Sequence, residues 1–182
     1  MKDILAQVTN LAPSHIQILL QIMRDLQTKQ SSLNSPVITI RDLFKWANRT
    51  HTTLEDLAVH GYLLLGERMR SKSERDFVKQ IIEHRCRVKL DIEKFLDNYA
   101  NQHLSNLFCL PTSLLQEFGI SSVGFTRTLQ RQASVIHICL SHKEAVLLVG
   151  ETGRAKTTIC KLLALAMHVN LFQINVHESG SF

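Results

Sequence analysis

The chain has 182 residues, of which 45% are hydrophobic and 20% are charged, and its formal net charge is +5 at pH 7 with neutral histidines. This composition is typical of one or two globular domains with a buried core, and the mildly basic charge fits a nucleic-acid-rich environment without proving contact with nucleic acid. No apolar run approaches the length of a membrane span and the N-terminus lacks the apolar region of a signal peptide, so a protein of the membrane or the secretory pathway is not expected.

The four cysteines and nine histidines are scattered along the chain. Neither a C-x-x-C nor an H-E-x-x-H motif occurs, and their absence speaks against a disulfide framework or a zinc site. Scattered cysteines that form no such motif are typical of proteins in a reducing, intracellular compartment.

The first hundred residues are predicted to be helical. Ser14 is a candidate N-cap for a helix whose apolar residues, from Ile16 to Leu26, recur at helical spacing. Residues 28–36 are polar and include a proline, which predicts a loop. Thr39, with Asp42 three residues later, is a short variant of the capping box and predicts the start of a second helix.

Two more helices are predicted before the pattern changes. Residues 54–70 place most of their apolar side chains near one helical face. Ser73, with Asp76 three residues later, repeats the capping pattern and predicts the start of a fourth helix.

The helical signal weakens between residues 87 and 124. Val88, Leu90 and Ile92 alternate with polar residues, a pattern that fits a strand and a linker equally well. One proline and two glycines interrupt the rest of the stretch. The sequence therefore predicts three parts, which are a helical domain at 1–100, a linker at 101–125 and a second domain at 126–182.

The second domain is predicted to mix helices and strands. Thr126 is expected to begin a helix that carries apolar residues as far as Leu140. The apolar run Ala145–Val149 is typical of a strand that is buried on both faces, and Leu171–Val176 is predicted as a second strand. The fold class expected for the whole chain is α/β, with mainly helical content.

A glycine-bearing loop joins the first predicted strand to a helix with apolar residues from Ile159 to Ala166. This context is the one that a phosphate-binding P-loop, G-x-x-x-x-G-K-[ST], requires. The loop's N–H groups and the helix N-terminus would bind phosphate oxygens. The predicted nucleotide-binding residues are Gly150, Glu151, Thr152, Gly153, Arg154, Ala155, Lys156, Thr157 and Thr158.

Two of these residues have distinct roles in such a loop, and ATP with Mg²⁺ is the expected ligand. Lys156 would reach the β- and γ-phosphates, and the Thr157 hydroxyl would bind Mg²⁺. Ala155 stands where the motif has its second glycine. If that position requires a positive φ, the alanine Cβ costs about 1–2 kcal/mol, but its N–H donor is retained.

Three stretches of the chain resemble the midasin family, the dynein-related AAA ATPases of ribosome assembly. Residues 11–27 and 38–68 are similar to the helical lid of a midasin module, and residues 142–164 are similar to the start of the following module. The resemblance covers most of the chain and is weakest in the middle. It implies a helical AAA lid followed by an incomplete P-loop α/β domain.

The resemblance also implies roles and surroundings. Arg41 matches the sensor-2 arginine, which contacts the γ-phosphate of a nucleotide bound elsewhere, although a surface arginine at a helix start is an equal alternative. The implied partners are ATP, neighbouring AAA modules and the large-subunit preribosome, with no membrane. The implied location is the nucleus.

Residues needed for hydrolysis have no counterpart in the sequence. No apolar strand ending in Asp-Glu follows the P-loop, so the Walker B acid that holds Mg²⁺ and positions water is missing. A sensor-1 residue and an arginine finger are also without matching segments. We therefore expect ATP binding without hydrolysis by this chain alone.

Two other interpretations stay open at this point. In the first, the chain is a nonenzymatic helical module that binds protein or nucleic acid and carries a relic P-loop. In the second, it is a member of another AAA group, such as the dyneins or the MoxR-type ATPases. The first of these predicts no effect of nucleotide on thermal stability, and for nucleic acid it predicts binding that weakens steeply with salt.

Overall fold

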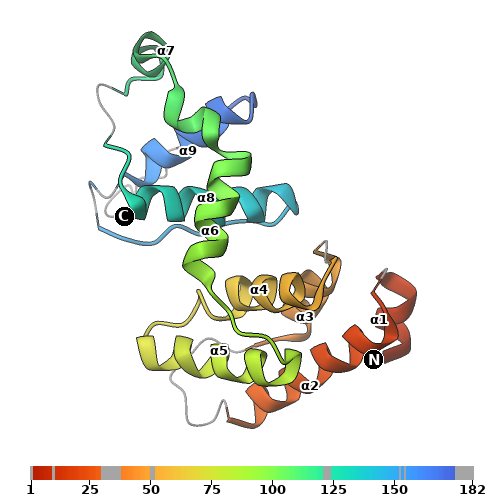
Figure 1. The fold of residues 1–182 in the computed structure, drawn as a ribbon. Coiled ribbons are helices and arrows are strands. Elements are labelled where there is room, and N and C mark those ends of the chain that lie inside the picture. The colour runs from red at the N-terminus through yellow and green to blue at the C-terminus, as the bar shows by residue number, and fades with distance from the viewer. Residues whose placement is uncertain are drawn as a thin grey trace, which may run out of the picture. The chain divides into compact units, whose positions relative to one another are not determined.

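Helices form the regular secondary structure of the chain (Figure 1). The structure is a computed structural model and describes residues 2–9, 11–29, 38–49, 52–120, 124–151, 153 and 155–174. None of these residues lies in a strand. The expectation of a mainly helical protein is thus confirmed, whereas the α/β part of the predicted fold class is not seen in the described ranges.

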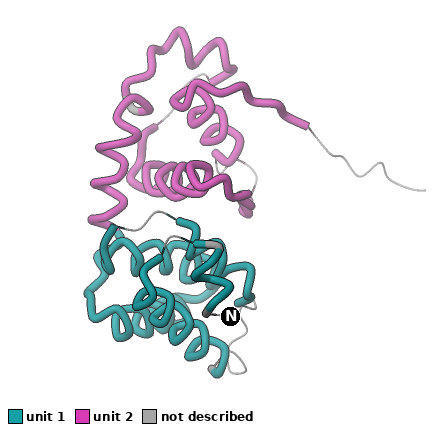
Figure 2. Tube along the Cα trace, turned by 90° about the vertical axis from the view of Figure 1, so that its right-hand side faces the viewer, with its two compact units in different colours: residues 1–92 teal, residues 93–182 magenta. Residues whose placement is uncertain are grey.

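The chain divides into two compact units, residues 1–92 and 93–182 (Figure 2). The sequence predicted the change of organisation slightly later, with a linker at 101–125. In the structure this stretch contains η2 (Ser105–Cys109) and α7 (Thr112–Glu117). Both contribute leucines to the core of the second unit, so the stretch packs with that unit as far as residue 120.

The first unit consists of helices that pack on one another in the order α1–α2–α5–α4–α3, with α2 also against α3. Their bounds are α1 Lys2–Val8, α2 Pro13–Lys29, α3 Ile40–Asn48, α4 Leu54–Leu65 and α5 Lys72–Cys86. The predicted N-cap Ser14 was wrong, since α2 begins at Pro13 and Ser14 lies inside its first turn; proline is well suited to the first helical position. Thr28 and Lys29, which were predicted as loop, belong to α2, and residues 30–36 of the predicted loop lie outside the described ranges.

Capping boxes start three helices of the first unit, α3, α4 and α5. The Asp42 carboxylate accepts hydrogen bonds from the Thr39 N–H at 2.8 Å and its hydroxyl at 2.9 Å, which confirms the predicted start of α3. For α5 the predicted cap was wrong. Ser71 and Glu74 form the reciprocal pair, at 3.1 and 3.2 Å, because the helix begins two residues earlier and leaves Ser73 inside its first turn.

Trp46 is at the centre of the first unit. Its side chain is fully buried, and its indole N–H donates to the Leu57 carbonyl at 2.8 Å. Gly61 on α4 lies flat against the indole ring, since a Cβ at that position would be 2.1 Å from Trp46 Cζ2. The absence of a side chain at Gly61 is what allows α3 and α4 to pack this closely.

The second unit contains α6 (Ile92–His103), η2, α7, α8 (Arg127–Ser141) and α9 (Lys156–Ala166). The predicted start of α8 is confirmed to within one residue, since Thr126 is its N-cap and the Thr126 hydroxyl accepts from the Leu129 N–H at 3.2 Å. The core of this unit combines residues of η2, α7, α8 and α9 with neighbours in the loops: Leu104, Leu107, Leu115, Ile120, Leu129, Ala133, Ile136, Ile159, Leu162 and Leu163.

Polar side chains join α8 to α6. Tyr99 Oη lies 2.8 Å from His137 Nδ1, and two ion pairs, Arg131–Glu93 and Arg127–Asp97, each measure 3.0 Å. Burial lowers the pKa of His137, and nearby His103 lowers it further, so both effects favour the neutral imidazole. These contacts fix α8, one of the two helices that start near the glycine-bearing loop.

The two predicted strands are not formed. Residues 145–149 and 171–174 have no regular secondary structure, and residues 175 and 176 lie outside the described ranges. An isolated apolar segment cannot be a strand without a neighbour to pair its N–H and C=O groups, and the described residues supply none. Leu147, Val149, Phe172 and Ile174 are consequently 85–88% exposed.

None of the described helices combines the length and the apolar character that a bilayer crossing requires.

Candidate functional site

The candidate site is built on the loop that precedes α9. Gly153 has a φ of +83° and Ala155 a φ of +55°, both in the left-handed region. From the sequence, backbone strain was expected at Ala155 if its φ is positive, and the structure shows that φ is positive there. Thr152 and Arg154, two of the predicted nucleotide-binding residues, lie outside the described ranges.

The first turn of α9 is open to an anion. Its N-cap is Ala155, which has no side chain to accept a hydrogen bond, and the first turn contains no acidic residue. The initial N–H groups of a helix have no partner within the helix and carry partial positive charge. The local sequence therefore leaves this helix end without the side-chain acceptor that a serine, threonine or aspartate N-cap would supply.

Lys156 bridges the loop. Its ammonium group donates to the carbonyl oxygens of Gly150 at 2.8 Å and Glu151 at 2.6 Å. An ammonium group has three N–H donors, so these two bonds leave one donor for a ligand. The bridge also ties the first two loop residues to the start of α9.

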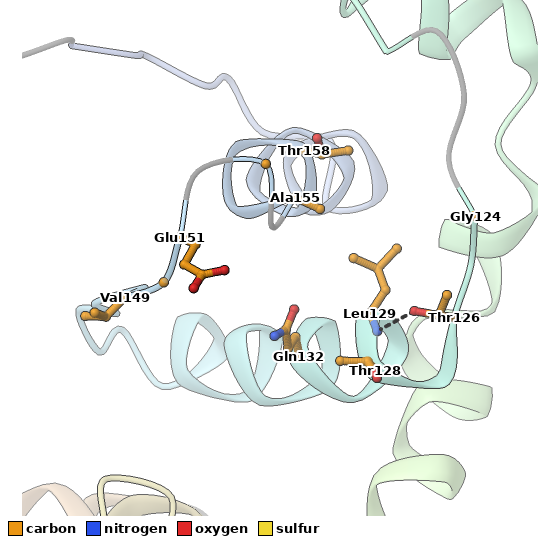
Figure 3. Close-up of a pocket in the computed structure, with 11 residues that line it drawn as sticks. Gly124, Thr126, Thr128, Leu129, Gln132, Val149, Glu151, Ala155 and Thr158 are labelled. Carbon is orange, nitrogen blue, oxygen red and sulfur yellow. Dashed lines mark hydrogen bonds between the residues drawn. The ribbon is translucent and has the colours of Figure 1, made fainter. Parts of the chain in front are cut away.

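A cleft of about 660 Å³ lies beside the loop, within the second unit (Figure 3). One wall is the loop with the start of α9, and the other is the start of α8 with the residues before it. Its volume is in the range of small-molecule sites. The lining residues are Val149, Gly150, Glu151, Gly153, Ala155 and Thr158 on the loop side, and Gly124, Thr126, Thr128, Leu129 and Gln132 on the α8 side.

Five of the seven described residues that were predicted to bind nucleotide line this cleft, and Lys156 is not among them. Thr158 lines it, whereas Thr157, the predicted Mg²⁺ ligand, is exposed on the first turn of α9 and is not among the lining residues. The α8 wall was not anticipated as part of a site. Thr126 was predicted only as the start of a helix, and nothing in the local pattern around Gln132 signals a ligand.

The α8 wall is uncharged. Its lining side chains are hydroxyls, one amide and one leucine, and the first turn of α8 has no acidic residue. Figure 3 shows Leu129 and Gln132 projecting from α8, and Glu151 from the loop, into the space between the two walls. Apart from Glu151, the described lining residues place no charged side chain along the cleft.

Arg41 lies in the first unit, on the first turn of α3, and its side chain is exposed. The neighbouring Asp42 is buried and holds Arg68 at 2.7 Å, so it anchors this turn. An exposed guanidinium on an anchored turn suits both alternatives left by the sequence, a contact with a ligand bound elsewhere and an ordinary surface arginine.

Side chains that commonly bind metal ions are not clustered in the part of the chain that the structure describes. The described ranges contain no group of three or more His, Cys, Asp and Glu side chains that would hold a metal ion. A cation at this site would need oxygen ligands from a bound phosphate compound as well as from the protein, which is how Mg²⁺ is commonly held.

Comparison with known proteins assigns the family. Residues 1–89 match the midasin AAA lid domain. Midasin of Dictyostelium discoideum is 36% identical over 188 residues, and midasin of Giardia intestinalis is 27% identical over 196 residues, with 98% and 95% of this chain covered. No solved structure matches significantly. The chain spans only 3% and 4% of the length of these two relatives, and it belongs to the midasin family of AAA proteins.

Proposed function

We propose that this chain binds Mg-ATP at the loop formed by residues 150–158, as part of a midasin-like AAA ATPase that acts in nuclear assembly of the large ribosomal subunit. The observation that carries the proposal is the Lys156 bridge to the carbonyls of Gly150 and Glu151. The bridge holds the Lys156 ammonium group beside the loop that leads into α9. The first N–H groups of α9 have no side-chain cap, so they can donate to an anion.

The residues around the bridge suit a phosphate chain. The third N–H of Lys156 and the N–H groups at the start of α9 would donate to phosphate oxygens by charge-assisted hydrogen bonds. Thr157 would contribute its hydroxyl to Mg²⁺, and the bound ion would neutralise phosphate charge. Exposure of this hydroxyl leaves it accessible to an ion.

The exposed apolar segments support a larger P-loop α/β domain. Residues 145–149 and 171–174 flank the loop and α9, and each leaves large apolar side chains facing solvent. In a parallel sheet such segments are buried on both faces. We infer that they become strands within the intact protein, where neighbouring residues complete the sheet.

ATP turnover is assigned to the intact protein. Hydrolysis requires an acidic residue that holds Mg²⁺ and positions water, and the sequence after the loop has no strand ending in Asp-Glu. We propose that Arg41 contacts the γ-phosphate of a nucleotide on a neighbouring AAA module, and that nucleotide-driven motion acts on the large-subunit preribosome.

The test is calorimetric titration of the folded chain with Mg-ATP. Lys156→Ala removes the ammonium group, and hydrogen bonds to charged groups of about 1.5–3 kcal/mol correspond to an affinity loss of roughly 10- to 150-fold. Lys89→Ala is the charge-matched control, because Lys89 is exposed in the first unit. Equal affinities for the wild type and Lys156→Ala would contradict the proposal, and no nucleotide binding at all would favour the nonenzymatic interaction module.

A further inference from the structure

Three aromatic rings meet where α6 crosses α8 in the second unit (Figure 1). Tyr99 and His103 belong to α6, and His137 belongs to α8. The ring centroid of Tyr99 lies 4.4 Å from that of His103 and 5.8 Å from that of His137, and the two imidazole centroids are 6.3 Å apart. We call these three side chains the ring cluster. It places two titratable imidazoles on opposite sides of one helix–helix contact.

The ring cluster suits a neutral His137. The Nδ1 atom of this residue lies 2.8 Å from the Tyr99 hydroxyl, and an unprotonated Nδ1 accepts the hydrogen of that hydroxyl. A protonated imidazole carries N–H on both nitrogens, so this acceptor is lost. His137 is also half-buried, so water would solvate its positive charge only in part.

No described carboxylate compensates for a positive charge on His137. Apart from the ring cluster itself, the side chains that act on Tyr99 and His137 are Cys139 and Ser141 of α8. The acidic residues of α6 that reach α8 are paired with its arginines instead. α9 also packs against α8, and none of its described side chains acts on His137.

We propose that the ring cluster makes the contact between α6 and α8 sensitive to acid, so that protonation of its two imidazoles loosens the second unit. Two imidazolium ions at this separation repel each other across the contact. The inference does not depend on nucleotide binding, because the ring cluster lies outside the residues that line the cleft.

The direction of the pH dependence follows from His137. Burial and the neighbouring His103 lower its pKa in the folded chain, so the unfolded chain takes up this proton at a higher pH than the folded chain does. The stability that the neutral imidazole supplies is therefore complete above about pH 6.5, the ordinary pKa of histidine, and is lost as the pH falls below that value.

The test is amide hydrogen exchange in α6 and α8 of the full chain at about pH 7.5 and about pH 5.5, a range that spans the titration of histidine. Each rate is compared with that of the unfolded chain at the same pH, and the ratio is the protection of the helix. Carboxylates ordinarily stay ionised over this range. Protection in both helices should fall by roughly three- to tenfold at the lower pH, the effect of two like charges at this separation when water screens them in part.

Two variants of the ring cluster and one control locate the effect. His137→Asn keeps an acceptor for the Tyr99 hydroxyl but does not titrate, so the fall in protection should disappear. His103→Asn replaces an exposed side chain and leaves the Tyr99–His137 hydrogen bond in place, so it should fold and should reduce the fall. His168→Asn is the matched control, because His168 is exposed after the end of α9 and should leave the fall unchanged.

Three results would overturn the inference. The first is equal protection of the wild-type helices at both pH values. The second is a fall in either ring-cluster variant as large as that of the wild type, and His103→Asn decides alone if His137→Asn does not fold. The third is loss of the fall in His168→Asn, which would indicate a general effect of removing a histidine.

Discussion

The two units of this chain bury their apolar residues to different degrees. The first unit encloses Trp46 and most of its large apolar side chains among its own helices. The second unit encloses a core around α8 and α9 but leaves Leu147, Val149, Phe172 and Ile174 almost fully exposed. The difference teaches that a helical lid completes its backbone hydrogen bonds within each helix, whereas an extended apolar segment does so only when a neighbouring strand pairs with it.

The largest effect is expected at the centre of the first unit. Gly61→Ala places a methyl group against the indole of Trp46, and overpacking of this kind costs about 3 kcal/mol in the free energy of unfolding. Trp46 is the single tryptophan of the chain, so denaturant unfolding followed by its fluorescence reports on this unit.

A double-mutant cycle sharpens the result. In a Trp46→Ala background the added methyl group has room, so Gly61→Ala should there cost nothing or stabilise α4 slightly, because alanine favours helix more than glycine does. Equal costs in both backgrounds, measured by circular dichroism, would show that the close approach of Trp46 and Gly61 does not set the stability of this unit.

A smaller effect of opposite sign is expected in the second unit. Ala155→Gly removes a Cβ from a left-handed position and should stabilise the unit by about 1 kcal/mol, a rise in melting temperature of roughly 4–8 °C for a unit of this size. Hydrogen exchange in α9 gives a local readout. Ala164→Gly in the interior of α9 is the control and should destabilise, whereas stabilisation by both substitutions would argue against strain at residue 155.

The smallest effect on stability is expected at the exposed segments. Phe172→Ser should change the free energy of unfolding by less than about 0.5 kcal/mol, since Phe172 is 88% exposed. The same substitution should reduce self-association, which sedimentation at increasing protein concentration measures, because exposed apolar segments are sites of aggregation. A loss of stability comparable to that of Gly61→Ala would mean that both units bury their apolar residues to the same degree.

Local signals predicted what local interactions decide. The Thr39–Asp42 pair and the helix start at Thr126 were predicted from the sequence, and the hydrogen bonds that fix both are made within one helical turn. The cap of α5 was misplaced because Ser71–Glu74 and Ser73–Asp76 satisfy the same S-x-x-[DE] pattern, and only the path of the chain before the helix distinguishes them.

Features that depend on distant parts of the chain could not be predicted in this way. The apolar pattern of residues 145–149 indicates a strand, but pairing depends on partners that the pattern does not specify. Likewise Gln132 precedes the loop by almost twenty residues, so its place in the cleft follows from the packing of α8 rather than from any motif. By contrast, the left-handed backbone at Ala155 follows from the glycine that the motif has there.

The Lys156 bridge has a further consequence, for conformational entropy. Fixing a free lysine side chain costs up to about 2 kcal/mol. Two hydrogen bonds to loop carbonyls already hold this one, so most of that ordering takes place when the chain folds. An anion that enters the loop meets a side chain in position, and its affinity is not reduced by the ordering of a mobile lysine.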